Sequence, residues 1–314
     1  MSYLGIDHGT SAIRFSLLPG NIYFEIPRGK GRFNVIEELS KRIEVKDIKL
    51  AGLTYSMGDA INKITLAEKV KGRGVVEEST GSYTGTGTKV YDEITENFKT
   101  LVIPGLHRNI EILDERFRAL YSHMASSEKV SLCYDAFLKL EGKVENIIVS
   151  DIGSNTVTIA IKNSKFFGAF DACIGAIGLE HGPLDLEAIR KIDRGEINAN
   201  NAFYVSGAKK IYNFKEPSEI LSPRNKKTQL ALDSLIISAR MEMFSFIAEV
   251  NPDAFVITGR GAESDIVFNS LKNSLEKIGR VIKLTKWSAA RGSAEIARDI
   301  AEGKRDILGI GVEL

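Results

Sequence analysis

The sequence predicts an α/β fold made of two duplicated domains, and three observations carry this prediction. An apolar strand that ends in an aspartate and a glycine turn occurs at residues 4–11 and again at residues 149–156. Each copy leads directly into a second strand and then into alternating helical and extended patterns, which are typical of an α/β layer. The chain has 314 residues, which is long for one hydrophobic core and sufficient for two. We therefore expect domains at residues 1–145 and 146–314.

The first half opens with three short strands, and the segment that joins the second to the third has the Pro-Gly-Asn composition of a tight turn. Helical and extended patterns alternate after them. The expected strands are residues 3–7, 12–18, 22–26, 48–55 and 99–103, and the expected helices are residues 33–43 and 112–124. Residues 71–89 are rich in glycine and threonine and lack the Gly-Lys-Ser/Thr ending of a Walker loop. We expect an exposed loop there, with a mobile lid as the alternative.

The second half repeats this order from residue 147 onward. A three-strand meander comes first, and helices alternate with strands after it. The expected strands are residues 147–150, 156–161, 166–171, 253–258 and 281–284, and the expected helices are residues 186–192 and 230–250. A turn at residues 259–263 leads into a further helix, and a closing helix begins at residue 288. Small side chains in the closing helix allow close approach between helices.

The composition excludes several classes of protein. Apolar residues make up 43% of the chain and charged residues 26%, which is typical of a globular protein. A net charge of +1 is too small to attract nucleic acid or an anionic membrane, so we expect neither partner. No apolar run is long enough to span a bilayer, and an early strand argues against a signal peptide. Two cysteines are too few for a disulfide scaffold, so we expect a cytoplasmic protein.

The repeated strand-turn-strand segments have the composition of phosphate-binding hairpins. Glycine lets the backbone approach the anion, turn N–H groups point at it, and serine or threonine hydroxyls add donors. The predicted phosphate contacts are Gly9, Thr10, Ser11 and Arg14 on the first hairpin and Gly153, Ser154, Asn155 and Thr156 on the second. An ion pair at the surface is the alternative for Arg14. One hairpin in each half predicts a cleft that closes on a nucleotide.

An aspartate in each hairpin is the candidate catalytic group. A carboxylate repels phosphate, so Asp7 and Asp151 are expected to hold a hydrated Mg²⁺ against the phosphate oxygens. One of them would also orient or deprotonate the attacking nucleophile. The alternative is that each aspartate caps its turn through a local hydrogen bond.

These motifs resemble those of the actin, hexokinase and acetate kinase (ASKHA) superfamily of ATP-binding proteins. The resemblance lies in two phosphate motifs, an adenosine motif and a second connecting helix, at residues 5–14, 150–156, 255–262 and 289–294. It implies two ribonuclease H-like (actin-like ATPase) domains with a nucleotide cleft between them, and ATP and Mg²⁺ as ligands. It also implies that Gly259, Arg260 and Gly261 contact the nucleoside.

More narrowly, the whole chain resembles the archaeal family called methanogenesis marker protein 12. The segments that carry the resemblance are residues 5–10, 53–59, 103–109, 113–119 and 171–176. It implies a methanogenic archaeon and an ATP-site fold, with no substrate. The preferred function is ATP binding with slow hydrolysis or phosphoryl transfer to an unknown acceptor. The alternatives are an ATP-driven electron donor and a non-enzymatic, ATP-gated assembly factor that binds a protein partner during maturation of a methanogenesis enzyme.

The four histidines do not predict a zinc site, because none of them forms a helical His-x-x-x-His pair. His8 lies in the first phosphate turn and is expected near ATP. His107 and Arg108 follow a strand end, where α/β folds open to ligands, so they could bind an anionic group together. A solvated loop is the alternative for that pair.

The two cysteines flank the second hairpin, with Cys133 before it and Cys173 after it. This placement resembles the ATP-dependent activators of 2-hydroxyacyl-CoA dehydratases, in which a symmetric dimer holds one [4Fe–4S] cluster on four thiolates. The resemblance implies a homodimer and an ATP-driven electron donor. The preferred interpretation is two buried, unreactive cysteines, because the glycine spacing matches only in part and the activators' following histidine is missing.

Overall fold

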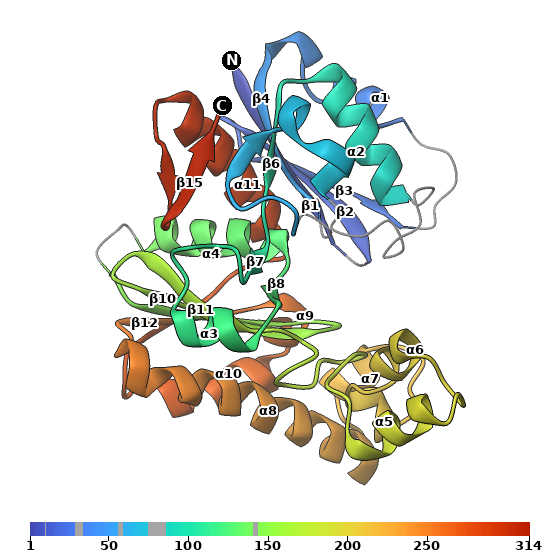
Figure 1. Cartoon of the computed structure of the whole chain (residues 1–314). Helices are drawn as coiled ribbons and strands as arrows, with labels where there is room; N and C mark the ends of the chain where they lie inside the picture. The colour runs from blue at the N-terminus through green and yellow to red at the C-terminus, as the bar shows by residue number, and fades with distance from the viewer. Residues whose placement is uncertain (10, 29–33, 56–58, 75–85, 141–143) are drawn as a thin grey trace. The chain divides into compact units, whose positions relative to one another are not determined.

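The computed structural model describes residues 1–314 except 10, 29–33, 56–58, 75–85 and 141–143. The chain forms two compact units: unit 1 is Met1–Gly142 together with Trp287–Leu314, and unit 2 is Lys143–Lys286 (Figure 1). This division differs from the expected one, because the closing segment belongs to unit 1 and the first boundary lies a few residues earlier. The α/β fold class is confirmed, whereas the cleft between the domains stays a prediction.

Unit 1 is built on an eight-stranded sheet with the order β14-β15-β5-β6-β4-β1-β2-β3. Its strands are β1 (Ser2–His8), β2 (Ala12–Leu18), β3 (Ile22–Pro27), β4 (Ile48–Thr54), β5 (Ile64–Leu66), β6 (Thr100–Ile103), β14 (Asp306–Ile307) and β15 (Ile310–Glu313), and a separate ribbon pairs β7 (Leu106–His107) with β8 (His123–Ala125). Its helices are α1 (Val35–Ser40), α2 (Thr86–Asn97), α3 (Glu115–Leu120), α4 (Ser127–Lys139) and α11 (Ser288–Ala301).

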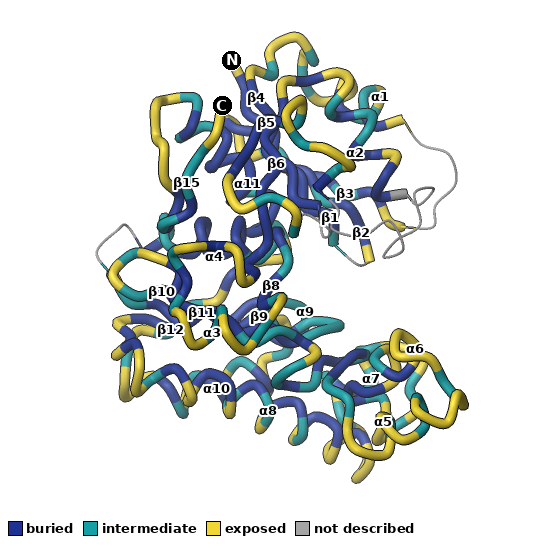
Figure 2. Tube along the Cα trace, in the orientation of Figure 1, coloured by how far each residue is buried: buried dark blue, intermediate teal, exposed yellow. Residues whose placement is uncertain are grey.

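The central strands of unit 1 are apolar on both sides, as Figure 2 shows by their burial. Leu4 and Ile6 of β1 belong to a core that also contains side chains of α1 and α2. Gly5 lies against α11, and a Cβ there would overlap the Ala290 carbonyl. Gly52 of β4 meets the same helix. The sheet is therefore covered by helices on both faces. The predicted close approach between helices is found at Gly292 of α11, where a Cβ would overlap the Ser131 carbonyl of α4.

Unit 2 repeats this plan on a five-stranded sheet with the order β11-β10-β9-β12-β13. Its strands are β9 (Ile147–Ile152), β10 (Thr156–Lys162), β11 (Lys165–Phe170), β12 (Ala254–Thr258) and β13 (Arg280–Lys283). Its helices are α5 (Leu186–Asp193), α6 (Ala199–Tyr204), the 3₁₀ turn η5 (Ala208–Lys210), α7 (Ser218–Leu221), α8 (Lys226–Val250), α9 (Gly259–Glu263) and α10 (Asp265–Leu275).

The two sheets share one topology, which confirms the duplication. In each sheet an antiparallel meander of three strands is extended by parallel strands on the side of its first strand: β4 is parallel to β1, and β12 is parallel to β9. The carboxyl ends of these neighbouring parallel strands meet at one edge of each sheet. That edge is where an α/β fold places its ligands, and both aspartate turns lie there.

The longest helix, α8, has clear start and stop signals. The side chains of Asn225 and Thr228 form a capping box at its first turn, and Asn251 ends it in the left-handed conformation with φ 51°. One side of this helix is apolar and buried, through Leu232, Leu235, Ile236, Ala239, Met243 and Phe246. In the described part of the chain, no helix is long and apolar enough to cross a membrane.

Candidate functional site

The first hairpin buries its aspartate against an arginine. Asp7 ends β1 and lies directly across the ladder from Arg14 of β2. Arg14 donates from Nη1 to Asp7 Oδ2 at 3.2 Å, and its Nε lies 3.3 Å from a carboxylate oxygen of Glu25. Asp7 is only 3% exposed, and its Oδ1 has no hydrogen-bond partner among the described residues. A buried, unpaired carboxylate oxygen is costly, so it is a place where an external donor or hydrated cation fits.

The surroundings of Asp7 favour its protonated form. Burial, reinforced by the carboxylate of Glu128, raises the pKa of Asp7 to about 6, although the charges of Arg14 and Lys129 act in the opposite direction. At pH 7 the carboxylate is ionised at a cost in folding free energy. A cation bound beside Oδ1 would remove part of that cost.

His8 is a structural residue of this turn, not a cationic ligand. Its backbone N–H donates to Thr54 Oγ1 at 3.1 Å, and its Nε2 lies 3.2 Å from the Gly87 carbonyl oxygen. Burial and the nearby Arg28 guanidinium lower the pKa of His8 to about 4, so the ring is neutral at pH 7.

The rest of the first turn is only partly described. Arg28 donates to the backbone carbonyls of Gly9 and His8, and this fixes the course of the chain. Ser11 is exposed, as a phosphate contact requires. The predicted contact Thr10 lies outside the described residues.

A carboxylate–imidazole pair that the sequence reasoning missed lies near this edge of unit 1. His123 Nδ1 is 2.6 Å from Asp59 Oδ2, and each side chain is slightly more than one quarter exposed. Asp59 follows β4, and His123 opens β8, which pairs with the β7 strand that follows β6. With Nδ1–H donating to the carboxylate, the pair fixes the tautomer and the orientation of the ring.

The predicted anion site at His107 and Arg108 is not formed. His107 is buried, and its Nε2 donates to the Ile61 carbonyl at 2.8 Å, whereas Arg108 is exposed. The imidazole therefore fixes a loop, and the two side chains do not act together.

The second hairpin turns several polar side chains toward one neighbouring segment, residues 177–181. Thr156 is fully buried and donates to the Ile177 carbonyl at 2.8 Å, so it is not placed to contact a phosphate. Ser154 Oγ donates to Glu180, and Asn155 Oδ1 accepts from His181 Nδ1 at 2.7 Å. Asp151, at the end of β9, is half-buried and faces Val157 across the ladder.

The turn predicted to contact the nucleoside packs directly on the second hairpin. Gly259 has φ +82°, and a Cβ there would overlap Asp151 Oδ1 and the Ile152 carbonyl. A Cβ at Gly261 would come within 2.5 Å of the Ile152 side chain. Because neither position has room for a Cβ, both residues must be glycine for the turn after β12 to pack on the hairpin. A larger residue at Gly259 would therefore clash within unit 2, so it would disturb folding and not only block a ligand.

A pocket of about 470 Å³ opens beside this turn, in unit 2 alone. Its walls come from α7, α9 and the start of α10, and its lining residues are Ser218, Leu221, Ser222, Arg260, Glu263, Ser264, Asp265 and Ile266. Arg260, one of the predicted nucleoside contacts, therefore lines this pocket.

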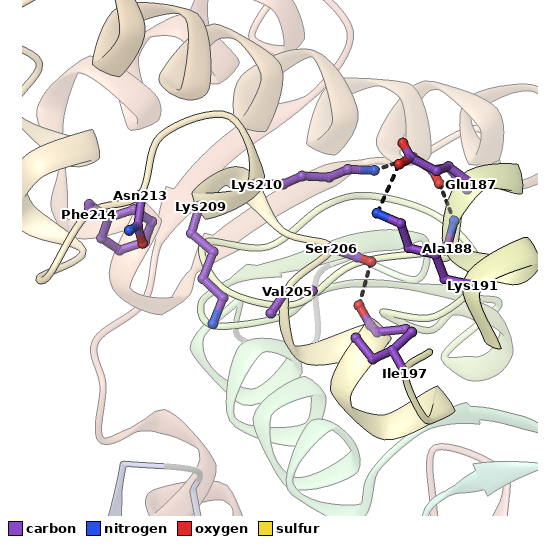
Figure 3. Close-up of a pocket in the computed structure, with 12 residues that line it drawn as sticks. Glu187, Ala188, Lys191, Ile197, Val205, Ser206, Lys209, Lys210, Asn213 and Phe214 are labelled. Carbon is purple, nitrogen blue, oxygen red and sulfur yellow. Dashed lines mark hydrogen bonds and ion pairs between the residues drawn. The ribbon is translucent and has the colours of Figure 1, made fainter. Parts of the chain in front are cut away.

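A second pocket, of about 540 Å³, lies among α5, α6 and the residues around η5 (Figure 3). Lys210 pairs with Asp185, and Lys191 pairs with Glu187 at 2.9 Å on the same side. Lys209 extends away from these pairs in Figure 3. No motif or unpaired buried group in the described chain gives this pocket a ligand.

One buried carboxylate of unit 2 lies outside both pockets. Glu242 of α8 accepts from Thr158 Oγ1 and from the Ala176 N–H, each at 2.6 Å. Burial raises the pKa of Glu242 to about 8, although these two hydrogen bonds lower it in part. Its carboxylate ties the loop after β11 to α8, and its role is structural.

The two cysteines do not fit an iron–sulfur cluster. Cys133 of α4 is completely buried in unit 1, and Cys173 is exposed in unit 2. Cys173 Sγ donates to Asp171 Oδ2 at 3.5 Å. A buried Cys133 cannot reach a cluster shared with another copy unless α4 repacks. The electron-donor alternative is therefore dropped, and the expectation that both thiols are buried holds only for Cys133.

Among the described residues, no group of three or more His, Cys, Asp or Glu side chains is placed to hold a metal ion directly. A Mg²⁺ ion at Asp7 would therefore be held by water and phosphate oxygens as well as by protein. This donor set is the one that Mg²⁺ prefers, so the residues fit the ion in that form.

Solved structures of kinases resemble the whole chain. The acetate kinase of Porphyromonas gingivalis aligns with a TM-score of 0.65 at 11% identity, covering 96% of this chain and 99% of that one. A ROK family glucokinase from Streptomyces griseus, solved with glucose and AMPPNP, aligns with a TM-score of 0.56 at 11% identity, covering 95% and 100%. Component A of the Acidaminococcus fermentans (R)-2-hydroxyglutaryl-CoA dehydratase aligns with a TM-score of 0.51 at 14% identity, covering 96% and 99%. At these identities the likeness shows the fold alone, a two-domain α/β fold shared with these proteins.

Sequence relatives are much more similar. No protein-family model matches the chain. A UPF0285 protein of Methanocaldococcus jannaschii is 48% identical, covering 100% of this chain and 99% of the relative. UPF0285 proteins of Methanococcus maripaludis strain C5 and Methanothermobacter thermautotrophicus are 46% and 44% identical, covering 100% of each chain in the first case and 99% and 98% in the second. With relatives this similar along its whole length, the chain belongs to the UPF0285 family.

Proposed function

We propose that this protein binds ATP with Mg²⁺ and either hydrolyses it slowly or transfers its γ-phosphoryl group to an acceptor. The observation that carries the proposal is the join in unit 2 between the Gly259 turn and the Asp151 hairpin. A pocket large enough for a nucleoside is lined by Arg260 of this turn, and the turn itself packs on a glycine hairpin that carries a carboxylate. The ASKHA fold supports the assignment, since a glucokinase of this fold was solved with AMPPNP.

In this proposal the base and ribose occupy the pocket walled by Arg260, and the phosphates run toward Gly153 and Asp151. Successive backbone N–H groups of that hairpin bind phosphate oxygens. Ser154 and Asn155 hold the turn in shape through Glu180 and His181 and are secondary contacts. Thr156 is not among the contacts.

Asp7 and Asp151 would hold Mg²⁺ through water, and the ion would neutralise charge on the phosphates. The unpaired Oδ1 of Asp7 fits this role, and Arg14 fixes the other oxygen. His123, oriented by Asp59, is the group best suited to accept a proton from a nucleophile in unit 1. An acceptor hydroxyl or a water molecule would give up that proton as its oxygen bonds to phosphorus and ADP leaves.

The sources of the relatives bear on the narrower assignment. The named relatives come from Methanocaldococcus, Methanococcus and Methanothermobacter. This distribution supports the resemblance to methanogenesis marker protein 12 and an archaeal origin. The distribution of the relatives does not identify the molecule that would accept the phosphoryl group.

Isothermal titration calorimetry with ATP and Mg²⁺ tests the proposal, with AMPPNP as the non-hydrolysable form. Asp151→Asn should weaken Mg²⁺-dependent binding by about tenfold or more, because a charge-assisted contact is lost. Ser222→Trp should fill the nucleoside pocket and abolish binding. The matched control is Val205→Trp, which fills the second pocket and should leave affinity unchanged.

Unchanged affinity in Ser222→Trp would move the nucleoside out of this pocket. Absence of any ATP binding by the parent protein would overturn the proposal. Binding without turnover, even with long incubation, would favour the ATP-gated assembly factor over the enzyme.

A further inference from the structure

One polar side chain of the nucleoside pocket is carried on a firmly held turn. Arg260 lies between Gly259 and Gly261, and both glycines pack on the second hairpin with no room for a Cβ. The backbone of Arg260 is therefore fixed from both sides. Its side chain is half-buried, lines the pocket, and has no hydrogen bond or ion pair with another residue that the structure describes. The guanidinium is thus well placed and available to a ligand.

The other polar side chains of this pocket are exposed to water or already used. Ser264 is less exposed than the others, but its hydroxyl donates to the Leu221 carbonyl at 3.0 Å. The exposed polar side chains are those of Ser218, Ser222, Glu263 and Asp265. Within the described lining, no polar side chain other than Arg260 is therefore both shielded from water and available to a ligand.

This difference matters because a base offers two kinds of surface. Its edge carries the donors and acceptors that distinguish one base from another, whereas its flat face is similar in all bases. A site rejects the wrong edge strongly only when a buried polar group would be left unpaired. An exposed carboxylate or hydroxyl returns to water instead. A planar guanidinium, in contrast, stacks on the face of any base.

The charges of the pocket favour a base beside Arg260 over a phosphate. The lining carries one cation, Arg260, and two carboxylates, Glu263 and Asp265, so its formal charge is −1. Such walls repel a triphosphate, whereas a base is neutral at pH 7. The guanidinium is therefore suited to contact the ring, with the phosphates lying toward the second hairpin.

We propose that this pocket binds the face of a purine by stacking on Arg260 and does not select its edge. The ligand class is then purine nucleoside triphosphates in general, so GTP and ITP should bind as well as ATP. The inference rests on the proposed function and adds a substrate class to that site. Leu221 and Ile266 supply apolar contact area for a flat ring. A pyrimidine has a smaller face, so CTP should bind more weakly.

Titration calorimetry of the parent protein with ATP, GTP, ITP and CTP in the presence of Mg²⁺ tests the base selectivity. The dissociation constants of the three purine nucleotides should lie within about tenfold of one another. A preference for ATP over GTP of about a hundredfold or more would overturn the inference, because that ratio requires a paired polar group at the edge of the base.

Variants of Arg260 test the stacking, with inorganic tripolyphosphate as a probe that has no base. Arg260→Leu should weaken ATP and GTP by the same factor, about tenfold or more, and leave binding of tripolyphosphate unchanged. Arg260→Lys keeps the charge and lacks the planar group, so it should not restore the affinity. The matched control is Arg280→Leu, at an exposed arginine of β13 outside both pocket linings, which should leave every affinity unchanged.

The possible failures are distinguishable. If Arg260→Leu weakens tripolyphosphate as much as ATP, or if Arg260→Lys binds ATP like the parent, then Arg260 acts through its charge and the stacking is wrong. Tight binding that is strictly selective for ATP would overturn this inference and leave the proposed function intact. Failure of every nucleotide to bind would overturn the proposed function, and this inference with it.

Discussion

The two hairpins that contain Asp7 and Asp151 have the same backbone arrangement, but the charges around the two carboxylates differ. Both acids end the first strand of an antiparallel meander, at the same edge of a sheet. Across the ladder from Asp7 stands Arg14, whereas the matching position opposite Asp151 is Val157. Asp7 is buried with a raised pKa, and Asp151 is half-buried.

Duplication has therefore preserved the strand geometry and left the charge environment free to change. In unit 1 the carboxylate is held by a guanidinium and kept from water, as suits a group that must take one fixed position. In unit 2 the carboxylate lies against a glycine turn beside a pocket, which is suitable for a group that contacts a reversibly bound ligand. Three sets of variants test this difference.

Removing the arginine should have the largest effect. We expect Arg14→Leu to lower the free energy of unfolding by about 3 to 5 kcal/mol at pH 7.5, because it leaves a buried carboxylate without its cation. Chemical denaturation measures the change. The matched variant in unit 2, Val157→Leu, should have a small effect.

The cause can be isolated with a double variant. Asp7→Asn combined with Arg14→Leu should recover much of the lost stability, because the buried charge is gone as well. If the double variant is as unstable as Arg14→Leu alone, packing of the arginine stem is the cause, and the electrostatic contrast between the hairpins is lost.

Removing the charge of Asp7 should have the next largest effect, and its sign depends on pH. The folded pKa of about 6 lies above the ordinary value of 3.8 for an aspartate, so the parent protein loses stability as the pH rises from about 4 through 6. Asp7→Asn lacks this loss. Its stability relative to the parent should therefore be higher at pH 7.5 than at pH 4 by about 2 to 3 kcal/mol.

The same variant should lose Mg²⁺-dependent ATP binding, so stability and affinity should move in opposite directions. Thermal melts at the two pH values, followed by calorimetry, give both readings. If the stability difference between Asp7→Asn and the parent does not change with pH, the pKa of Asp7 is not raised in the folded protein.

The turn glycines should show the smallest effect. A Cβ at Gly9 would lie 2.7 Å from Arg14 Nη1 and 2.8 Å from the Ala12 carbonyl oxygen, whereas a Cβ at Gly153 would meet nothing closer than 3.6 Å. We expect Gly9→Ala to cost about 1 to 2 kcal/mol and Gly153→Ala less than about 0.5 kcal/mol by denaturant unfolding. Equal costs would indicate that the two turns are more alike than their contacts suggest.

The sequence predicted the strands of both meanders well, because each is a short apolar run bounded by turn residues. The predicted strand at residues 12–18 matches β2 at both ends. The helix expected at residues 112–124 is shorter, because Asp114 caps its start and Tyr121 ends it in the extended conformation before β8. A strand of three residues carries too little pattern to be recognised.

The candidate site was predicted in part. Asp7 and Asp151 were found because each belongs to a repeated motif. The Asp59–His123 pair was missed because 64 residues separate its members, and no local pattern records a contact that the fold creates. The burial of Thr156 was missed for a related reason: its partner, the Ile177 carbonyl, comes from a loop whose path the sequence does not specify.

The return of α11 to unit 1 has a consequence for how the chain is made. Ser293 packs on β4, and Val312 of β15 pairs with Ile64 of β5 in the first sheet. During synthesis these residues leave the ribosome only after all of unit 2. Unit 2, being continuous in sequence, can fold while translation proceeds, whereas one face of β1 and β4 must wait for the last segment. The newborn chain therefore exposes that face of β1 and β4 until residues 287–314 have emerged from the ribosome.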